Sequence, residues 1–150
     1  MTLVKTPGAL KKFIRTPWRF QQTFQTPLQD LERFVSVIMA ANPAQTATVT
    51  IQEIVFECDT LNASLGVAPG TLRHNDSITA SDGEAGKLLF QCLSGWIDFL
   101  YTPSPKPFII YADHDEYATF YANTKSGLNQ VIIPLRDAGF KIVDDWTRTF

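Results

Sequence analysis

Residues 107–150 read PFIIYADHDEYATFYANTKSGLNQVIIPLRDAGFKIVDDWTRTF, and this stretch decides the predicted fold. Its pattern predicts a strand, an acidic turn, a second strand, a helix and a third strand. A strand–helix–strand unit makes a right-handed parallel crossover when both strands belong to one sheet. The sequence therefore predicts a small C-terminal sheet with β-β-α-β order.

Alternation within the first two strands predicts the register of the acidic hairpin. The apolar faces of the two strands carry Phe108, Ile110, Ala112, Ala118, Phe120 and Ala122. These faces lie on one side of the sheet only if Ala112 opposes Ala118, which requires a turn of odd length around Asp115. The opposite face carries Ile109, Tyr111, Tyr117, Thr119 and Tyr121. This tyrosine-rich face is either half covered or a binding surface.

The helix after the hairpin has clear limits. Ser126 can cap its start, and Gly139 suits the left-handed residue that ends a helix, with Phe140 folding back on Leu135. Its apolar stripe is Leu128, Val131, Ile132 and Leu135. Residues 140–146 form the last strand. A parallel crossover would place Asp144 and Asp145 at the sheet end away from the acidic turn.

The preceding sequence predicts three helices, over residues 27–41, over residues 51–65, and from Ser81 to Leu100. Each start has the spacing of a capping box, in Thr26 and Gln29, Thr50 and Glu53, and Ser81 and Glu84. The third helix contains Gly86 and Gly95, which predicts close packing there. Residues 66–80 read as a loop, and residues 102–107 as a stiff proline-rich linker.

The segment TATVTIQEIVF, residues 46–56, is rich in β-branched residues, which favours a strand. Its alternation breaks, because Val49 and Ile51 are odd-numbered whereas Ile54 and Phe56 are even-numbered. Helical spacing continues unbroken from Ile51 to Leu65, so the period favours a helix over 51–65. The resulting fold class is α+β, with a helical N-terminal half packed on the small C-terminal sheet.

Composition agrees with one globular domain. The chain has 150 residues, of which 45% are hydrophobic and 19% charged, and its net charge is −2. Residues 1–25 differ from the rest, because they hold five cations and the first acid is Asp30. We predict a basic aromatic N-terminal arm over 1–25, as helical turns or extended chain, and a single domain over 26–150.

Several function classes lack support in the sequence. Two cysteines, Cys58 and Cys92, make neither a disulfide framework nor a zinc ligand set, and are expected to be buried thiols. No apolar run is long enough to span a bilayer, and the N-terminus has no apolar signal core. Glycines do not cluster into a phosphate loop, so no cofactor is predicted. We expect a cytoplasmic protein.

The turn Asp113-His114-Asp115-Glu116 is the densest cluster of ionisable groups. It has the residue types of a divalent-metal site or an acid/base pair, but acidic residues are also common turn formers, and we favour a solvated turn. His74, in the predicted loop, is a second candidate base. These residues support an alternative function, a small hydrolase that uses His114 or His74 with nearby carboxylates and, in one form, a metal ion.

The N-terminal arm interleaves cations with aromatic residues, which favours a charged partner. Its candidate binding residues are Lys11, Lys12, Arg15, Trp18 and Arg19. Five cations are few for nucleic acid, although a nucleic acid or a membrane surface also fits this pattern. The opposing interpretation is that the aromatic rings pack onto the domain while the cations face water.

The leading functional prediction is a non-enzymatic protein-interaction module of regulatory type, such as an inhibitor, an immunity-type protein or an adaptor. It rests on the lack of a catalytic constellation and on three candidate surfaces. These are the basic arm, the acidic hairpin and the tyrosine-rich face. The predicted binding residues are Asp113, His114, Asp115 and Glu116 on the hairpin, and Tyr111, Tyr117 and Tyr121 on the tyrosine-rich face.

Overall fold

A computed structural model describes residues 1–5, 8–81 and 83–150. Within them the chain forms five helices and one eight-stranded antiparallel sheet of order β1-β4-β3-β5-β6-β7-β2-β8. The elements in chain order are β1 Thr2–Lys5, α1 Ala9–Arg15, β2 Phe20–Gln25, α2 Leu31–Ala41, β3 Thr46–Ile54, α3 Asp59–Leu65, β4 Asp76–Ala80, α4 Ala85–Ser94, β5 Ile97–Ser104, β6 Ile109–Ala112, β7 Tyr117–Ala122, α5 Lys125–Asp137 and β8 Ile142–Val143.

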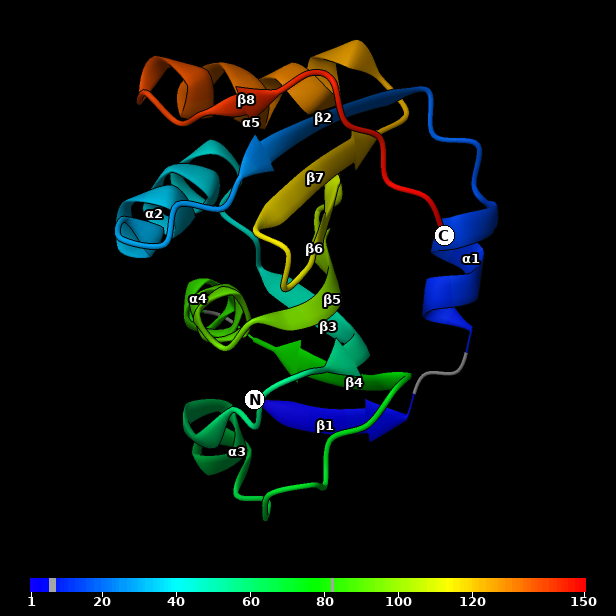
Figure 1. The fold of residues 1–150 in the computed structure, drawn as a ribbon, viewed down its shortest axis with the longest axis vertical. Coiled ribbons are helices and arrows are strands. Elements are labelled where there is room, and N and C mark those ends of the chain that lie inside the picture. Colours follow the sequence, from blue (N-terminus) through cyan, green and yellow to red (C-terminus); the bar gives the residue numbers. More distant parts are fainter. Residues whose placement is uncertain (6–7, 82) are drawn as a thin grey trace.

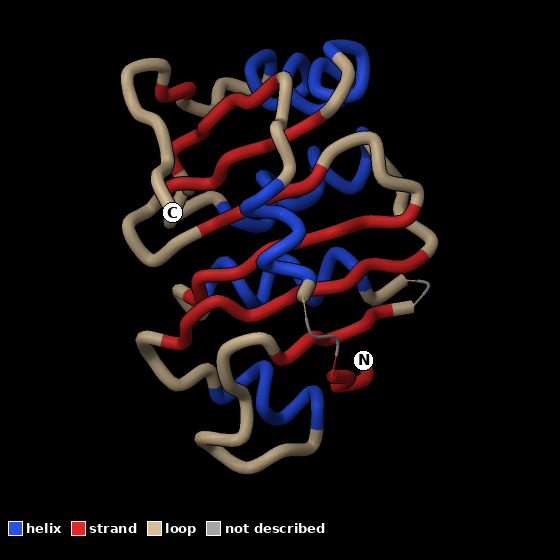
Figure 2. The backbone as a smooth tube through the Cα atoms, turned by 90° about the vertical axis from the view of Figure 1, so that its right-hand side faces the viewer, coloured by secondary structure: helices blue, strands red, loops and turns tan. Residues whose placement is uncertain are grey.

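The twisted sheet separates two unequal layers. Helices α2, α3, α4 and α5 lie on one face, and α1 lies on the other with the C-terminal segment beside it (Figures 1 and 2). The main core fills the space between the sheet and the four helices, with Phe24, Phe34 and Phe120 packed edge to face. A smaller apolar cluster lies under α1. We call the sheet surface beneath α1 the α1 face.

The predicted fold class is wrong, because helices and strands are interleaved along the whole chain. Five of the eight strands come from residues 1–104, where no strand was predicted. The four strands β1, β4, β3 and β5 are neighbours in the sheet, so half of the sheet is built without any strand of the predicted C-terminal unit.

The β3 strand includes the first four residues of the helix predicted over 51–65. Its pairing with β5 shifts between Ile51 and Glu53, where a bulge inserts one extra residue. A bulge reverses the parity of the residues that follow it, which explains why alternation breaks in the sequence. The β-branched composition therefore indicated the true structure. Only α3 remains helical, and it ends at Leu65 as predicted, before the left-handed Gly66.

A second correction concerns the predicted helix from Ser81 to Leu100. Helix α4 stops at Ser94, Trp96 adopts a left-handed backbone with φ of 58°, and β5 begins at Ile97. Beyond Trp96 the buried residues of the main core alternate at Ile97, Phe99 and Tyr101, which is strand periodicity. The strand also includes the first half of the predicted linker, and β4 occupies the end of the predicted 66–80 loop.

The three predicted capping boxes fail. The residues preceding α2 and α4 are Asp30 and Glu84, and neither side chain makes a capping hydrogen bond. At Thr26, the backbone N–H instead donates to the Glu116 carbonyl at 2.7 Å, which ties this residue to the acidic hairpin. The remaining box, Thr50 and Glu53, lies on β3, where no helix starts.

The predicted register of the acidic hairpin is confirmed. Ala112 opposes Ala118 in the pairing of β6 with β7, which leaves five residues between the two. The C-terminal helix is also confirmed, although Thr124, not Ser126, caps it by accepting from the Gly127 amide at 3.0 Å. Its end has the predicted contact, because the Phe140 amide donates to the Leu135 carbonyl at 3.2 Å.

The last strand differs from the prediction in length and in partner. Strand β8 has two residues and pairs antiparallel with β2. Since β2 also runs antiparallel to β7, strands β7 and β8 point the same way but are not neighbours. The predicted crossover is therefore interrupted by a strand from the N-terminus.

Residues 1–25 do not form an arm separate from the sheet. Their described residues supply β1, α1 and β2, and β2 lies between β7 and β8. Phe13 and Phe24 are buried, which agrees with the interpretation that the aromatic residues pack onto the domain. The cations Lys11, Lys12, Arg15 and Arg19 remain on the surface.

Candidate functional site

The tyrosine-rich face predicted from the sequence is covered. Tyr111 and Tyr121 are only 5% and 4% exposed, and they pack with Leu10 and Phe13 of α1. Phe13 stacks on Tyr111 at a ring distance of 5.7 Å and meets Tyr121 edge-on at 5.0 Å. Burial raises the pKa of both tyrosines, so both hydroxyls stay protonated.

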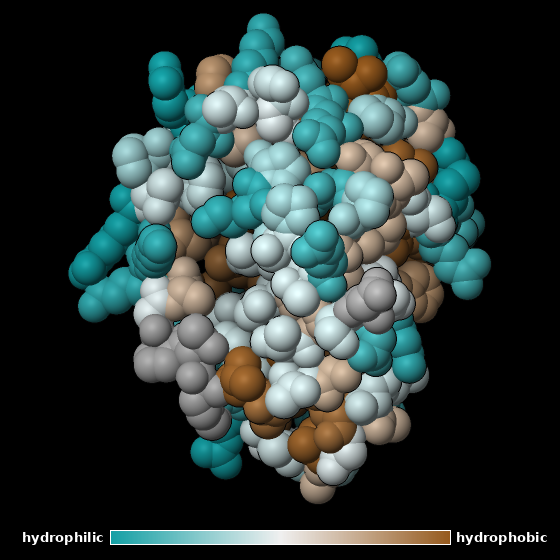
Figure 3. Space-filling model, turned by 180° about the vertical axis from the view of Figure 1, so that it is seen from behind, coloured by the Kyte–Doolittle hydropathy of each residue, from teal (hydrophilic) through white to brown (hydrophobic). Residues whose placement is uncertain are grey.

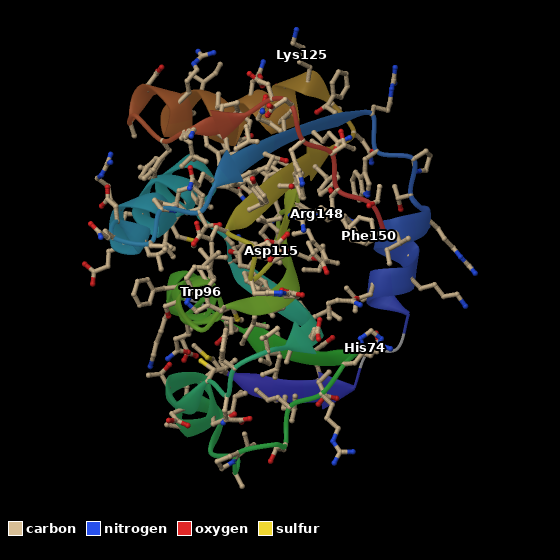
Figure 4. All side chains as sticks on the ribbon, in the orientation of Figure 1. His74, Trp96, Asp115, Lys125, Arg148 and Phe150 are labelled. Atoms are coloured by element: carbon tan, nitrogen blue, oxygen red, sulfur yellow. The ribbon has the colours of Figure 1, made fainter. Side chains whose placement is uncertain are left out.

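The C-terminal segment, residues 144–150, extends along the α1 face, and Arg148 holds it there (Figure 4). The Arg148 side chain is 6% exposed and forms an ion pair with Asp113, whose side chain is 9% exposed. Its guanidinium also lies 4.6 Å from the Tyr111 ring centroid and 4.9 Å from that of Trp146. Arg148 therefore joins the tail to the hairpin by charge and by cation–π contact.

Further hydrogen bonds and ring contacts surround this ion pair. Arg148 donates to Thr119 Oγ1 at 3.2 Å and to the carbonyl oxygens of Tyr111 and Tyr117 at 3.4 Å. The Trp146 ring stacks on Tyr117 at 4.4 Å. Three of the predicted binding residues, Tyr111, Asp113 and Tyr117, are thus in contact with the chain's own tail.

The acidic hairpin contains a second polar pair. His114 contributes its backbone N–H and its ring Nδ1 to Asp98 Oδ1, at 2.7 and 2.8 Å. This hydrogen bond raises the pKa of His114 above its ordinary value, although burial opposes the shift. The ring Nε2 lies 3.7 Å from Asp115. His114 therefore carries positive charge over a wider pH range than a free histidine.

The remaining turn residues are placed mainly by the backbone. Asp113 Oδ1 accepts from the amides of Asp115 and Tyr117, at 2.9 and 3.2 Å, which is an Asx-type turn. Glu116 takes a left-handed backbone with φ of 74°. A hollow of about 240 Å³ lies between the hairpin, Asp98 and the tail. Within the described ranges, no group of three or more His, Cys, Asp or Glu side chains could hold a metal ion.

The other candidate base, His74, hydrogen-bonds to β3 and not to the acidic hairpin. Its Nδ1 is 2.8 Å from the carbonyl oxygen of Gln52, the residue of the β3 bulge. The neighbouring Asn75 amide donates to the Ile51 carbonyl at 2.8 Å. These contacts give His74 a structural role, in which it satisfies a carbonyl group that the bulge leaves unpaired.

The basic residues predicted as binding groups gather around α1. The residues Lys11, Lys12, Arg15 and Arg19 are all exposed, and hydrophilic side chains project from the side of the molecule that carries α1 (left in Figure 3). Among the residues that the structure describes, none of these four cations forms an ion pair. Trp18 is half buried, and its indole N–H donates to the Phe13 carbonyl at 3.1 Å.

A hollow of about 300 Å³ lies beside these cations. It is formed by α1, Trp18, the β5 strand and the chain around Lys106, and residues of the smaller core line it. Lys12 and Lys106 both border the hollow and are exposed. The sequence predicted the basic residues of this surface but not the hollow, because Lys106 belongs to a distant segment.

Two residues of the hairpin site were missed in the sequence. Asp98 falls within the helix predicted from Ser81 to Leu100, whereas it lies on β5 beside His114. The alternation of Ile97, Phe99 and Tyr101 around it is the signal that could have placed it. For Arg148 no local pattern was available, since its partner Asp113 is 35 residues away.

None of the helices in the described parts of the chain is long and apolar enough to cross a membrane. No protein-family model, no curated protein and no solved structure matches this chain.

Proposed function

We propose that this protein is a non-enzymatic interaction module that binds an acidic segment of a partner protein through the surface of α1. The observation that supports the proposal is the cluster of exposed cations on α1, which have no ion-pair partner among the described residues although the chain as a whole is acidic. A positive patch attracts a negative partner surface and speeds its association.

Packing explains why α1 is preferred to the other two predicted surfaces. Tyr111 and Tyr121 are buried, and Asp113 is paired with Arg148, so a partner would have to remove α1 or the tail to reach them. Helix α1 needs no such change, because Leu10 and Phe13 anchor its inner side while Lys11, Lys12 and Arg15 face outward.

Affinity capture with charge-reversed variants tests the proposal. The test variant carries Lys11→Glu, Lys12→Glu and Arg15→Glu. The matched control carries Arg73→Glu, Lys87→Glu and Lys125→Glu, at exposed positions outside α1. Each replacement changes the charge by −2, so both variants go from −2 to −8. We expect the control to retain the partner and the α1 variant to lose it; retention by both variants refutes the proposal.

One observation supports a second candidate, a hydrolase that uses His114. The bond between Asp98 and His114 Nδ1 orients the ring and leaves Nε2 as the group available for proton transfer. The raised pKa of His114 suits a general acid better than a general base at neutral pH. Substrate turnover that is abolished by His114→Gln, in a protein that remains folded, would favour this function over the interaction module.

A further inference from the structure

The hollow beside α1 combines an apolar floor with a basic rim. Phe13, Leu100 and Ile109, all buried residues, belong to the floor, and Trp18 forms part of its wall. Lys12 reaches the rim from α1, and Lys106 reaches it from the connection between β5 and β6. The floor thus belongs to the smaller core, while the rim carries two like charges from separate elements.

The floor is built on the sheet and held by neighbouring rings. Leu100 pairs with Tyr111 across β5 and β6, and Ile109 pairs with Tyr121 across β6 and β7. Trp18 is fixed by its hydrogen bond to the Phe13 carbonyl and by its ring contact with Tyr121 at 6.0 Å. A rigid apolar recess of this kind can receive a side chain with little rearrangement.

The size of the hollow limits its occupant. A volume of about 300 Å³ is at the lower end of the range of ligand pockets, so it suits one large side chain better than a drug-sized molecule. The basic rim selects for negative charge on either side of that side chain. Thr102 and Asn123, also at the hollow, are only partly buried or exposed and can hydrogen-bond to a peptide backbone.

We propose that this hollow is an anchor pocket, which receives one aromatic or large aliphatic side chain from a partner peptide while carboxylates next to that side chain contact Lys12 and Lys106. This inference rests on the proposed function, because the same acidic partner segment supplies both the charge and the anchor. Pockets that take up one apolar anchor often carry most of the energy of an interface.

Short synthetic peptides test the anchor separately from the charge. The first peptide has two glutamates on each side of a central phenylalanine, the second replaces the phenylalanine by alanine, and the third replaces every glutamate by glutamine. Titration is followed by amide chemical shifts. We expect the first peptide to bind at least about tenfold more tightly than either of the others, because the second loses the buried aromatic side chain and the third loses its charge contacts with Lys12 and Lys106. The largest shifts should fall at Lys12, Trp18 and Ile109.

Protein variants locate the same site. Lys106→Glu should weaken binding of the first peptide about tenfold, whereas Lys125→Glu, an exposed charge reversal that does not border the hollow, should change it less than about twofold. Equal binding of the phenylalanine and alanine peptides overturns the anchor, as do shifts confined to other surfaces. If the partner is still lost from the α1 variant in the capture experiment, the proposed function survives that failure. If the α1 variant also retains the partner, both proposals are refuted.

Discussion

Replacement of Arg148 by methionine tests whether the tail is an integral part of the domain. Methionine keeps much of the side-chain volume but removes the ion pair with Asp113, the hydrogen bonds to Thr119 and two carbonyl groups, and the cation–π contacts. Removal of one partner from a buried ion pair costs about 3–5 kcal/mol. Asp113 keeps two backbone N–H donors on Oδ1, so the lower value, about 3 kcal/mol, is expected.

Urea unfolding measures this loss. With a denaturant slope of about 2 kcal/mol per M, a loss of about 3 kcal/mol lowers the midpoint by about 1.5 M. The matched control is Arg136→Met, because Arg136 is exposed and its contact with Asp137 is 3.9 Å long. We expect the control to stay within about 0.5 kcal/mol of the parent protein. An equally small change for Arg148→Met would refute the claim that this cation fastens the tail to the sheet.

A double-mutant cycle isolates the ion pair from the other contacts of Arg148. Asp113→Asn is combined with Arg148→Met, and the free energies of unfolding of the four proteins are compared. Residues in direct contact show coupling energies of about 0.5–3 kcal/mol, and we expect a value near the upper end. Additive effects would mean that the ring and carbonyl contacts, not the charge pair, hold the tail.

Two further predictions concern His114 and the glycines near the two ends of α4. The folded-state pKa of His114 is raised by Asp98, so its contribution to stability is fully present below about pH 6.5 and is lost as the pH rises through the folded pKa. The stability difference between the parent protein and His114→Gln should therefore shrink from pH 6 to pH 9; a pH-independent difference would contradict the pairing. Gly95→Ala should destabilise the protein by about 1–3 kcal/mol, because the new Cβ would lie 2.7 Å from Cys58 Sγ, and thermal unfolding would detect this. Gly86→Ala should be much milder, since its nearest neighbour, at 3.2 Å, is the flexible Met39 side chain; equal effects at the two sites would show that close packing is not the cause.

The sequence was most informative where pairing is local. The hairpin register followed from the alternation around Asp115, and the end of α5 followed from the spacing of Leu135, Gly139 and Phe140. It was misleading where one residue breaks a period. The bulge near Gln52 shifted the parity of β3, and the left-handed Trp96 separated α4 from β5 within one apolar stretch.

Pairing between strands far apart in the chain explains the features that the sequence did not predict. Strand β2 contacts β7 and β8, which lie about a hundred residues away along the chain, and no local pattern predicts such partners. The site divides in the same way. The cations of α1 were identified from their positions in the sequence, whereas the Asp98–His114 and Asp113–Arg148 pairs appeared only when the sheet brought them together.

The most direct test of the proposed function is the affinity of one purified partner for three proteins at two salt concentrations. These are the parent protein, the α1 variant with Lys11, Lys12 and Arg15 reversed, and the control with Arg73, Lys87 and Lys125 reversed. We expect the parent and control to bind with similar affinity and to weaken as salt rises, and the α1 variant to bind weakly at both concentrations. Equal loss in both variants would contradict the proposal, because net charge alone would then explain the binding.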